Sequence, residues 1–332
     1  MRKGKIKDQV LIRSVLKELS ADRKNDKYIL TKASPAQGFL ATSGKDGCIY
    51  VAASDTVSGK FEGQCRHAVI GAANGAASSG ARPECAAITA VLPEHFDERN
   101  IKELAREAAE VCRELEISAE GGHTEISDAV SRPVITAEVF GRSEDGVIYS
   151  VRDIEPGDDI VITRSIGMEA VSVLIREKRE ALESRFAPDF LKRAYEYSKN
   201  ISIVSEAIFA KSCKEKISAM YDLSEGGIFS ALWRIADDSG CGLEVDLKSI
   251  PIRQETIEIC EFFNLNPYQI LSGGALLIAS KNGEALAEKF EALGTEAAVI
   301  GKMNDSNDKI IRNGEDVRYL DKPQIDELFR LF

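Results

Sequence analysis

Five consecutive residues combine several chemically capable groups in one short segment. Gly121-Gly122-His123-Thr124-Glu125 brings two glycines, an imidazole, a hydroxyl and a carboxylate together between a predicted helix and a predicted strand. Adjacent glycines let backbone amides approach an anion closely, and the flanking side chains suit phosphate, metal or substrate. We therefore predict a ligand-binding loop here. The alternative is an ordinary turn with a satisfied polar cluster.

Two further glycine pairs occur in the second half of the chain. Asp222-Leu223-Ser224-Glu225-Gly226-Gly227 precedes an amphipathic helical pattern. Ser224 suits the N-cap and Glu225 suits the first turn, so the segment is either a helix start or an acidic entrance that faces a cleft. Ser272-Gly273-Gly274 precedes an apolar strand, and it is either a turn or a place where the backbone passes close to a ligand.

One carboxylate follows a β-rich segment in the first half. The residues 48–53 (CIYVAA) lead into Ser54-Asp55-Thr56, so this strand delivers Asp55 to its tip. The following residues 64–79 are predicted as a helix so rich in glycine and alanine that another backbone is expected close to it. The 7 cysteines form no CxxC pair, and with the 3 histidines they match no zinc-ligand spacing.

The segments that position these residues alternate between strand and helix. In the first half we predict a short helix at 10–19, strands at 48–53, 85–92 and 133–141, helices at 64–79 and 100–116, and an edge strand at 147–151. In the second half we predict strands at 160–163, 217–220, 242–246, 275–279 and 296–300, and helices at 168–180, 187–211, 225–239, 254–263 and 283–293. A polar turn at 154–159 separates the halves. The pattern predicts layered α/β or α+β domains at 1–152 and 153–332.

Composition excludes several classes of protein. The chain has 332 residues, 44% of them hydrophobic, and a formal net charge of −11 without a long run of Lys and Arg. We therefore expect no nucleic-acid partner. Nowhere do 18 apolar residues run together, so no membrane association is expected. An odd number of scattered cysteines favours reduced thiols and a cytoplasmic protein.

Taken together, these motifs resemble one known superfamily. The resemblance is carried by Ser54 to Thr56, His67 to Asn74, Ser79 to Pro83, Gly121 to Glu125, Glu155 to Asp158, Ala219 to Gly227, Ser272 to Ile278 and Pro323 to Leu328. The chain resembles the PurM-like superfamily of aminoimidazole ribonucleotide (AIR) synthetase, selenophosphate synthetase, thiamine-monophosphate kinase and HypE. It is most similar to the HypE-like branch of AIR-synthase-related proteins.

The resemblance implies an α+β fold of two PurM-like domains. The sheet of the N-terminal domain pairs with a second subunit into a dimeric barrel, and the C-terminal domain is an α/β sandwich. It also implies that the homodimer binds ATP and magnesium near its interface and activates or phosphorylates a small substrate. The implied roles are catalysis by Asp55 and Glu125, metal binding by Asp55, nucleotide binding by Asn74, Gly121, Gly122, His123 and Thr124, and a substrate cleft at Asp222, Glu225, Gly226 and Gly227.

The chain departs from the resemblance in three places. Relatives usually carry a Gly-x-Asp segment where this chain has Pro35-Ala36-Gln37-Gly38-Phe39, and an aspartate where it has Gly75. Magnesium typically takes one or two carboxylates in proteins, so losing two would weaken phosphoryl transfer. HypE carries a C-terminal cysteine that accepts the carbamoyl group, and no cysteine follows Cys260 here.

Two classes of function therefore remain open. The first is an ATP-dependent enzyme of unidentified substrate, which uses Asp55, Glu125 and either Asp222 or Glu225. The second is a non-catalytic relative that binds a nucleotide or a partner. A hydrogenase maturation factor that lacks the terminal cysteine is a third variant, and it is the least favoured because thiocarboxamide formation needs a thiolate nucleophile.

Overall fold

The computed structural model describes residues 6, 8–21, 38–58 and 62–332, and these divide into two compact units. Residues 38–148 form the N-terminal unit. Residues 149–332 form the C-terminal unit, and the described residues before 22 are grouped with it. The sequence pattern predicts a domain boundary near 153 and a first helix that belongs to the N-terminal domain.

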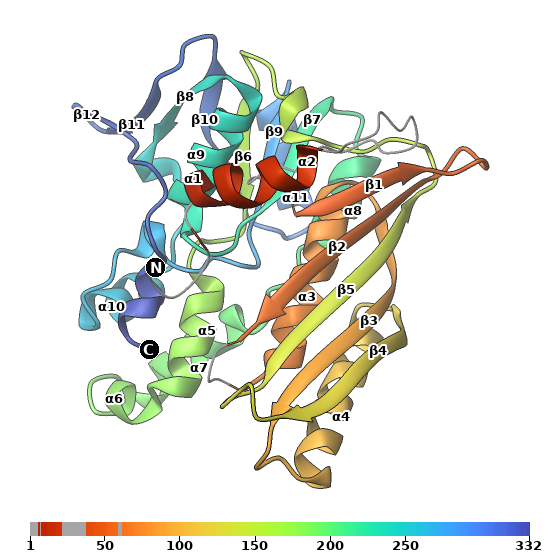
Figure 1. Ribbon diagram of the computed structural model, residues 1–332. Helices are drawn as coiled ribbons and strands as arrows, with labels where there is room; N and C mark the ends of the chain where they lie inside the picture. The colour runs from red at the N-terminus through yellow and green to blue at the C-terminus, as the bar shows by residue number, and fades with distance from the viewer. Residues whose placement is uncertain (1–5, 7, 22–37, 59–61) are drawn as a thin grey trace. The chain divides into compact units, whose positions relative to one another are not determined.

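The N-terminal unit is a five-stranded sheet with helices on one face (Figure 1). Its strands are β1 (Phe39–Ser43), β2 (Ile49–Val57), β3 (Arg82–Pro93), β4 (Ser118–Ser127) and β5 (Val134–Ser143), in the order β1-β2-β5-β3-β4. Helix α3 (Gln64–Ser78) packs on β2 and β5, and helix α4 (Glu98–Glu114) packs on α3. The β3–β4 pair is parallel because α4 makes the crossover between them.

Small residues allow α3 to lie close to the sheet. Ala68, Ala72 and Ala76 are at most 1% exposed. A Cβ atom at Gly75 would lie 3.2 Å from the Cβ atom of Ala53 on β2. The expected close approach of another backbone to this helix is therefore present, and the approaching backbone is β2.

The C-terminal unit contains a seven-stranded mixed sheet in the order β12-β11-β8-β10-β6-β9-β7. Its strands are β6 (Asp159–Thr163), β7 (Ile217–Asp222), β8 (Gly242–Asp246), β9 (Leu276–Ser280), β10 (Ala297–Asn304), β11 (Lys309–Asn313) and β12 (Asp316–Tyr319). Its helices are α5 (Met168–Glu177), α6 (Arg179–Glu183), α7 (Pro188–Ser198), α8 (Val204–Ser212), α9 (Gly227–Ser239), α10 (Gln254–Phe262) and α11 (Gly283–Ala292). We call the helical stretch Asp8–Ala21, made of α1 (Asp8–Leu11), a π-helical turn (Ile12–Leu16) and α2 (Lys17–Ala21), the lead helix.

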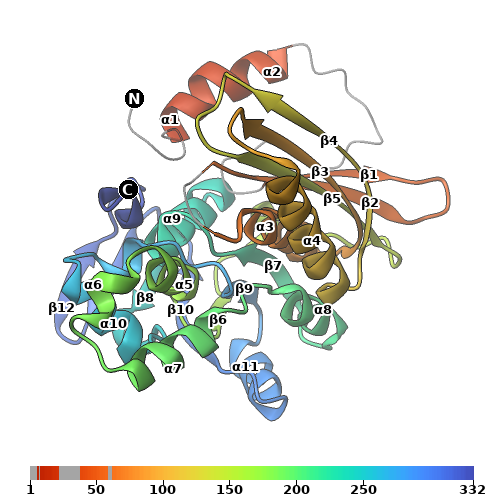
Figure 2. The same cartoon turned by 90° about the horizontal axis from the view of Figure 1, so that it is seen from below.

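Both faces of this sheet are covered by helices (Figure 2). Ile160 and Ile162 on β6 belong to the buried core that contains α9. Val161 points the other way, because a Cβ atom at Gly283, the first residue of α11, would lie 3.0 Å from its side chain. The expected α+β class with two domains and a C-terminal sandwich is therefore confirmed.

Several local expectations were wrong. Residues 121–125 lie within β4 rather than in a loop, and β1, β11 and β12 were not predicted. The expected strand at 147–151 is absent, because Asp145 accepts a hydrogen bond from the Val147 N–H and Ser143 donates to its carbonyl, which forms a turn. The predicted helices at 168–180 and 187–211 are each divided into two helices, α5 with α6 and α7 with α8.

In the described part of the chain, no helix is both long enough and apolar enough to cross a bilayer.

Candidate functional site

Asp55 lies on the face of β2 that α3 covers. Its Oδ1 atom accepts a hydrogen bond of 2.9 Å from the backbone N–H of Thr56. Its Oδ2 atom lies directly against Gly71 of α3, so that a Cβ atom at that position would overlap the carboxylate. Asp55 can therefore take this position only because residue 71 is a glycine.

Gly75 and Gly38, the two glycines that the resemblance places at aspartate positions, have different surroundings. Gly75 faces β2 at Ala53, and Ala53 is on the same side of this strand as Asp55. A carboxylate at residue 75 would thus lie on the Asp55 side of the sheet, next to the buried Asn74. Gly38 precedes β1, and a Cβ atom added there would have no described atom within 4 Å. The preceding residues 35–37 of the predicted departure lie outside the described residues.

The Gly121–Glu125 segment is part of the exposed edge strand β4. Gly122 has φ +143°, and a Cβ atom there would overlap the carbonyl group of Ile88 on β3. The second glycine of the pair is therefore needed for strand pairing. The Nε2 atom of His123 lies 3.2 Å from the Oε2 atom of Glu125, and both side chains are exposed.

The strand register separates Asp55 from His123 and Glu125. Gly122 pairs with Ile88, Ile88 pairs with Ala137, and Ala137 pairs with Asp55, so Gly122 and Asp55 lie in one row across the sheet. Three strand spacings put them about 14 Å apart. Because side chains alternate along a strand, the neighbouring His123 points to the opposite face from Asp55. One copy of the chain does not bring the two predicted catalytic carboxylates together.

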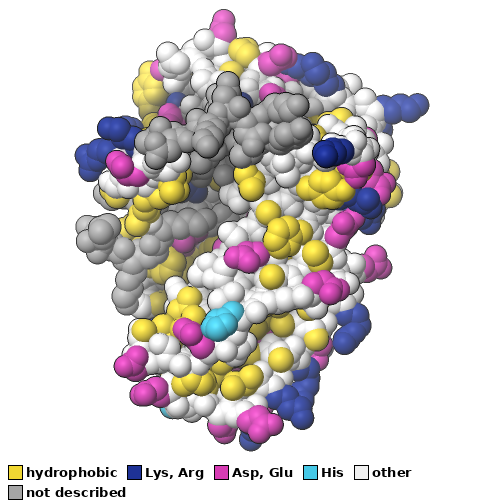
Figure 3. Space-filling model, turned by 45° about the vertical axis from the view of Figure 1, so that its right-hand side comes forward, with side chains coloured by type: hydrophobic (Ala, Val, Ile, Leu, Met, Phe, Trp, Pro, Cys, Tyr) yellow, Lys and Arg dark blue, Asp and Glu magenta, His cyan; other side chains and the backbone are white. Residues whose placement is uncertain are grey.

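The face of the sheet opposite α3, which we call the open face, carries exposed apolar side chains. Leu40, Tyr50 and Phe140 are 49%, 41% and 48% exposed. Figure 3 shows hydrophobic side chains scattered between acidic ones on the side turned forward. Glu138 on the central strand β5 belongs to this face, and sequence analysis missed it. The sequence does contain an indication of it, because Glu138 is a charged residue between two apolar residues of the same strand, Ala137 and Val139.

In the C-terminal unit, the two remaining glycine pairs meet at one edge of the sheet. Asp222 at the end of β7 pairs with Leu276 at the start of β9. The Ser272 N–H donates a hydrogen bond of 3.3 Å to the carbonyl of Ser224. The Ser272 hydroxyl accepts a bond of 2.9 Å from the N–H of Gly167, just before α5. We call residues 222–227 and 272–274 the double-glycine cluster.

The glycines of this cluster have backbone roles. Gly226 and Gly227 have φ +86° and +63°. A Cβ atom at Gly227 would lie 2.7 Å from the carbonyl oxygens of Tyr268 and Ile270, and one at Gly273 would overlap the carboxylate of Glu169. The N-cap of α9 is Gly226, so the alternative in which Ser224 caps the helix was wrong.

A buried carboxyl group from the C-terminal segment holds the cluster. Asp326 is 1% exposed. Its Oδ2 atom accepts a bond of 2.6 Å from the N–H of Gly226, and its Oδ1 atom accepts one of 2.9 Å from the N–H of Leu328. Burial raises the pKa of Asp326 to about 7, and the charge of Glu225 adds to the rise, while the two N–H donors oppose it. In the sequence, Asp326 is indicated only as part of the family resemblance.

Metal-binding groups are sparse. Across the residues that the structure describes, no three His, Cys, Asp or Glu side chains are placed to hold a metal ion together. In one copy, Asp55 has no second carboxylate from residue 75, and Glu125 is on the other face. These residues therefore do not fit a complete magnesium site within a single copy. Cys260 is buried, and desolvation raises its pKa to about 12, so its thiol is not poised as a nucleophile.

In sequence, this chain is similar to proteins that carry the name HypE. Carbamoyl dehydratase HypE of Rhizobium leguminosarum is 29% identical over 242 residues, which is 71% of this chain and 67% of that protein. The protein of the same name from Azotobacter vinelandii is 28% identical over 245 residues, 71% of this chain and 68% of that one.

Solved structures share the fold at lower identity. The HypE–HypF complex has a TM-score of 0.75 at 22% identity and covers 93% of this chain and all of that one. HypE in complex with ATP has a TM-score of 0.68 at 20% identity, covering 98% of each chain. The ThiL protein complexed with AMPPCP and TMP has a TM-score of 0.73 at 16% identity, covering 95% of this chain and 97% of that one.

Two protein-family models match the two halves of the chain in order. The N-terminal domain of AIR synthase related protein matches residues 46–143, and the C-terminal domain matches residues 155–313. Together they span well over half of the sequence, and the first contains Asp55 and the β4 segment, while the second contains the double-glycine cluster. The chain therefore belongs to the AIR synthase related protein family.

Proposed function

We propose that this protein is a HypE-like homodimer that binds ATP at its subunit interface and activates or phosphorylates a small substrate. Solved structures of the same fold support nucleotide binding, since one is HypE with ATP and another is ThiL with AMPPCP. The observation that carries the proposal is the open face, where apolar side chains lie on the same side of the sheet as His123 and Glu125.

The open face favours a second copy of the chain as its cover. Leu40, Tyr50 and Phe140 lie on three neighbouring strands, and burying such side chains stabilises an interface. His123 and Glu125 on β4 then belong to the same interface, so a nucleotide bound there would contact both subunits.

Light scattering tests the dimer. We expect wild-type protein at twice the chain mass of 36.3 kDa. Phe140→Glu places a charge on the open face and should give a monomer. Tyr319→Glu is the matched control, because Tyr319 is 69% exposed on β12 of the other unit and should leave the dimer intact. A wild-type monomer would contradict the proposal.

Calorimetry with ATP, with and without magnesium, tests the nucleotide site. His123→Ala and Glu125→Gln should weaken ATP binding, and Phe140→Glu should abolish it if the site is shared between subunits. Gly122 is a poor choice for substitution, because any side chain there would disturb the pairing of β3 and β4. Equal ATP affinity in wild type and all three variants would remove this site assignment.

A non-catalytic nucleotide-binding role is the second candidate, favoured by the incomplete carboxylate set of one copy. Measurement of ATP turnover separates the two: binding without turnover at saturating ATP and magnesium favours the second role. Carbamoyl transfer to Cys260 is disfavoured by its burial and raised pKa. Mass spectrometry after incubation with carbamoyl phosphate and ATP would detect a cysteine adduct, and none is expected.

A further inference from the structure

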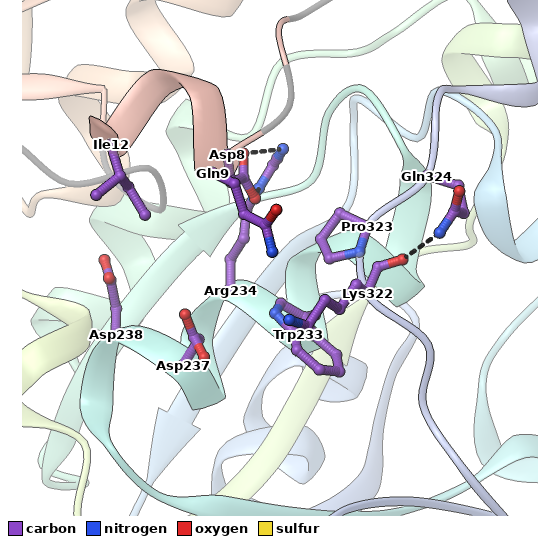
Figure 4. Close-up of a pocket in the computed structure, with 10 residues that line it drawn as sticks. All are labelled: Asp8, Gln9, Ile12, Trp233, Arg234, Asp237, Asp238, Lys322, Pro323 and Gln324. Carbon is purple, nitrogen blue, oxygen red and sulfur yellow. Dashed lines mark hydrogen bonds and ion pairs between the residues drawn. The ribbon is translucent and has the colours of Figure 1, made fainter. Parts of the chain in front are cut away.

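A cavity of about 260 Å³ lies within the C-terminal unit, away from the residues discussed above (Figure 4). The lead helix, the second half of α9 and the segment that follows β12 enclose it. Polar or aromatic lining residues from these elements include Asp8, Gln9, Trp233, Arg234, Lys322 and Gln324. A volume of this size suits a small molecule rather than a peptide.

Arg234 holds a carboxylate at one wall of the cavity. Its Nε and Nη2 atoms each lie 3.2 Å from one oxygen of Asp8, so the guanidinium binds the carboxylate with both arms. The buried side chain of Tyr221 also interacts electrostatically with this guanidinium. The side chain of Arg234 is only 11% exposed. This is the geometry with which arginine recognises planar oxyanions.

The two partners of this ion pair are anchored very differently. Arg234 belongs to α9, whose residues Leu232 and Ile235 are at most 2% exposed in the core. Asp8 belongs to the lead helix, where residues 8–16 include no buried side chain and Ile12 is 46% exposed. The cation is therefore fixed by the core, while the anion is supplied by an element with little hydrophobic attachment.

We propose that Arg234 and the adjoining cavity form a binding site for a small carboxylate- or phosphate-bearing molecule, and that Asp8 of the lead helix occupies the oxyanion position as an internal competitor. Trp233 and Lys322 on the neighbouring walls offer an apolar surface and a second cation. Asp237 and Asp238 also line the cavity, so a polyanion such as ATP is disfavoured and a singly anionic ligand is favoured.

The site is separate from the proposed ATP site, since it is formed entirely within the C-terminal unit. It is joined to the double-glycine cluster by two short connections. Helix α9 carries Arg234 and begins at Gly227. Gln324 lines the cavity, and the carboxylate of Asp326, two residues later, accepts a hydrogen bond from the N–H of Gly226.

Trp233 is the sole tryptophan of the chain, so its fluorescence reports directly on this cavity. We would titrate full-length protein with acetate, inorganic phosphate and ATP at constant ionic strength. In Asp8→Asn the tethered competitor is neutralised, and acetate or phosphate should bind at least about 10-fold more tightly than in wild type. Tighter acetate binding identifies a carboxylate ligand, and tighter phosphate binding identifies a phosphate ester.

Three variants make the test specific. Asp8→Asn/Arg234→Gln should lose the response to both anions. Asp237→Asn removes a negative charge from the same cavity without touching Arg234, and should change the affinity by less than about 3-fold. Asp8→Ala also removes the competing carboxylate and should bind the anions as tightly as Asp8→Asn, so it replaces that variant if circular dichroism shows that Asp8→Asn is misfolded. The proposal is overturned if Asp8→Asn and wild type bind the anions equally, or if the response survives Arg234→Gln.

Discussion

Both units contain glycine pairs that the sequence marks as candidate sites, but the exposure of the residues around them differs. In the N-terminal unit, Gly121 and Gly122 lie on an exposed edge strand, and the side chains that follow them are exposed as well. In the C-terminal unit, Gly227 lies against two backbone carbonyls, and the buried Asp326 accepts a hydrogen bond from the N–H of Gly226.

This difference separates two uses of similar motifs. The C-terminal cluster is completed by its own chain, through hydrogen bonds and tight backbone contacts. The N-terminal unit leaves His123, Glu125 and the apolar open face exposed, and under the proposed function a ligand or a second copy completes that site. Substitutions in the C-terminal cluster should therefore act mainly on stability, and those at His123, Glu125 and the open face mainly on binding and assembly.

The largest effect is expected from the pH dependence of Asp326. The rise of its pKa from 3.8 to about 7 means that the folded state binds a proton more tightly than the unfolded state. Stability is therefore greatest below about pH 4 for this group and is lost as the pH rises through 7, by about 4 kcal/mol in all. Urea unfolding between pH 4 and 8 should show a shallower fall for Asp326→Asn than for wild type. Parallel curves would contradict the assignment.

Gly227→Ala is expected to cost about 3 kcal/mol. The new Cβ atom would lie 2.7 Å from two carbonyl oxygens, and φ is +63°. Gly240→Ala is the matched control: this residue follows α9 with φ +73° and has no atom within 4 Å of an added Cβ, so it should cost only about 1 kcal/mol. Chemical unfolding of both variants measures the difference. Equal losses would show that the close carbonyls do not matter.

The two long helices of the N-terminal unit were predicted well. The expected helices at 64–79 and 100–116 are found at 64–78 and 98–114. The first was indicated by its many small residues and the second by an apolar stripe at helical spacing. Strand β4 was missed because it is exposed on both faces and so has no alternation of polar and apolar residues, while its glycines are typical of a loop. The β11–β12 hairpin is also largely exposed and was missed for the same reason.

The sites were less predictable than the elements. Asp326 holds Gly226 from 100 positions further along the chain, and no local spacing indicates that contact. The pairing of Asp8 with Arg234 spans 226 positions. Likewise, the sequence places Asp55 and Glu125 in matching family motifs, but only the strand register reveals that they face opposite sides of one sheet.

Gly71→Ala tests how tightly α3 packs against Asp55 in the N-terminal unit. An added methyl group overlaps the Asp55 carboxylate, and although alanine favours a helix, we expect a net loss of about 2 kcal/mol. The Asp55→Ala/Gly71→Ala double variant should recover most of this loss, because the overlapping group is gone. Thermal unfolding of the four proteins gives the coupling. Additive effects of the two substitutions would mean that Asp55 moves aside without cost.

The smallest effect on stability, and the most informative for function, is expected from Gly75→Asp. Its carboxylate would face β2 on the same side as Asp55, so like-charge repulsion should lower stability by about 1 kcal/mol without metal. Magnesium should reverse this loss in the variant, raise its melting temperature more than that of wild type, and speed magnesium-dependent ATP turnover, because a second carboxylate then completes the ligands that magnesium prefers. Gly75→Asn, of similar size but neutral, should show neither response. Brisk wild-type turnover that Gly75→Asp leaves unchanged or lowers would mean that residue 75 is not at the metal position, and that carboxylates elsewhere, such as Glu125 or Asp222, already serve it.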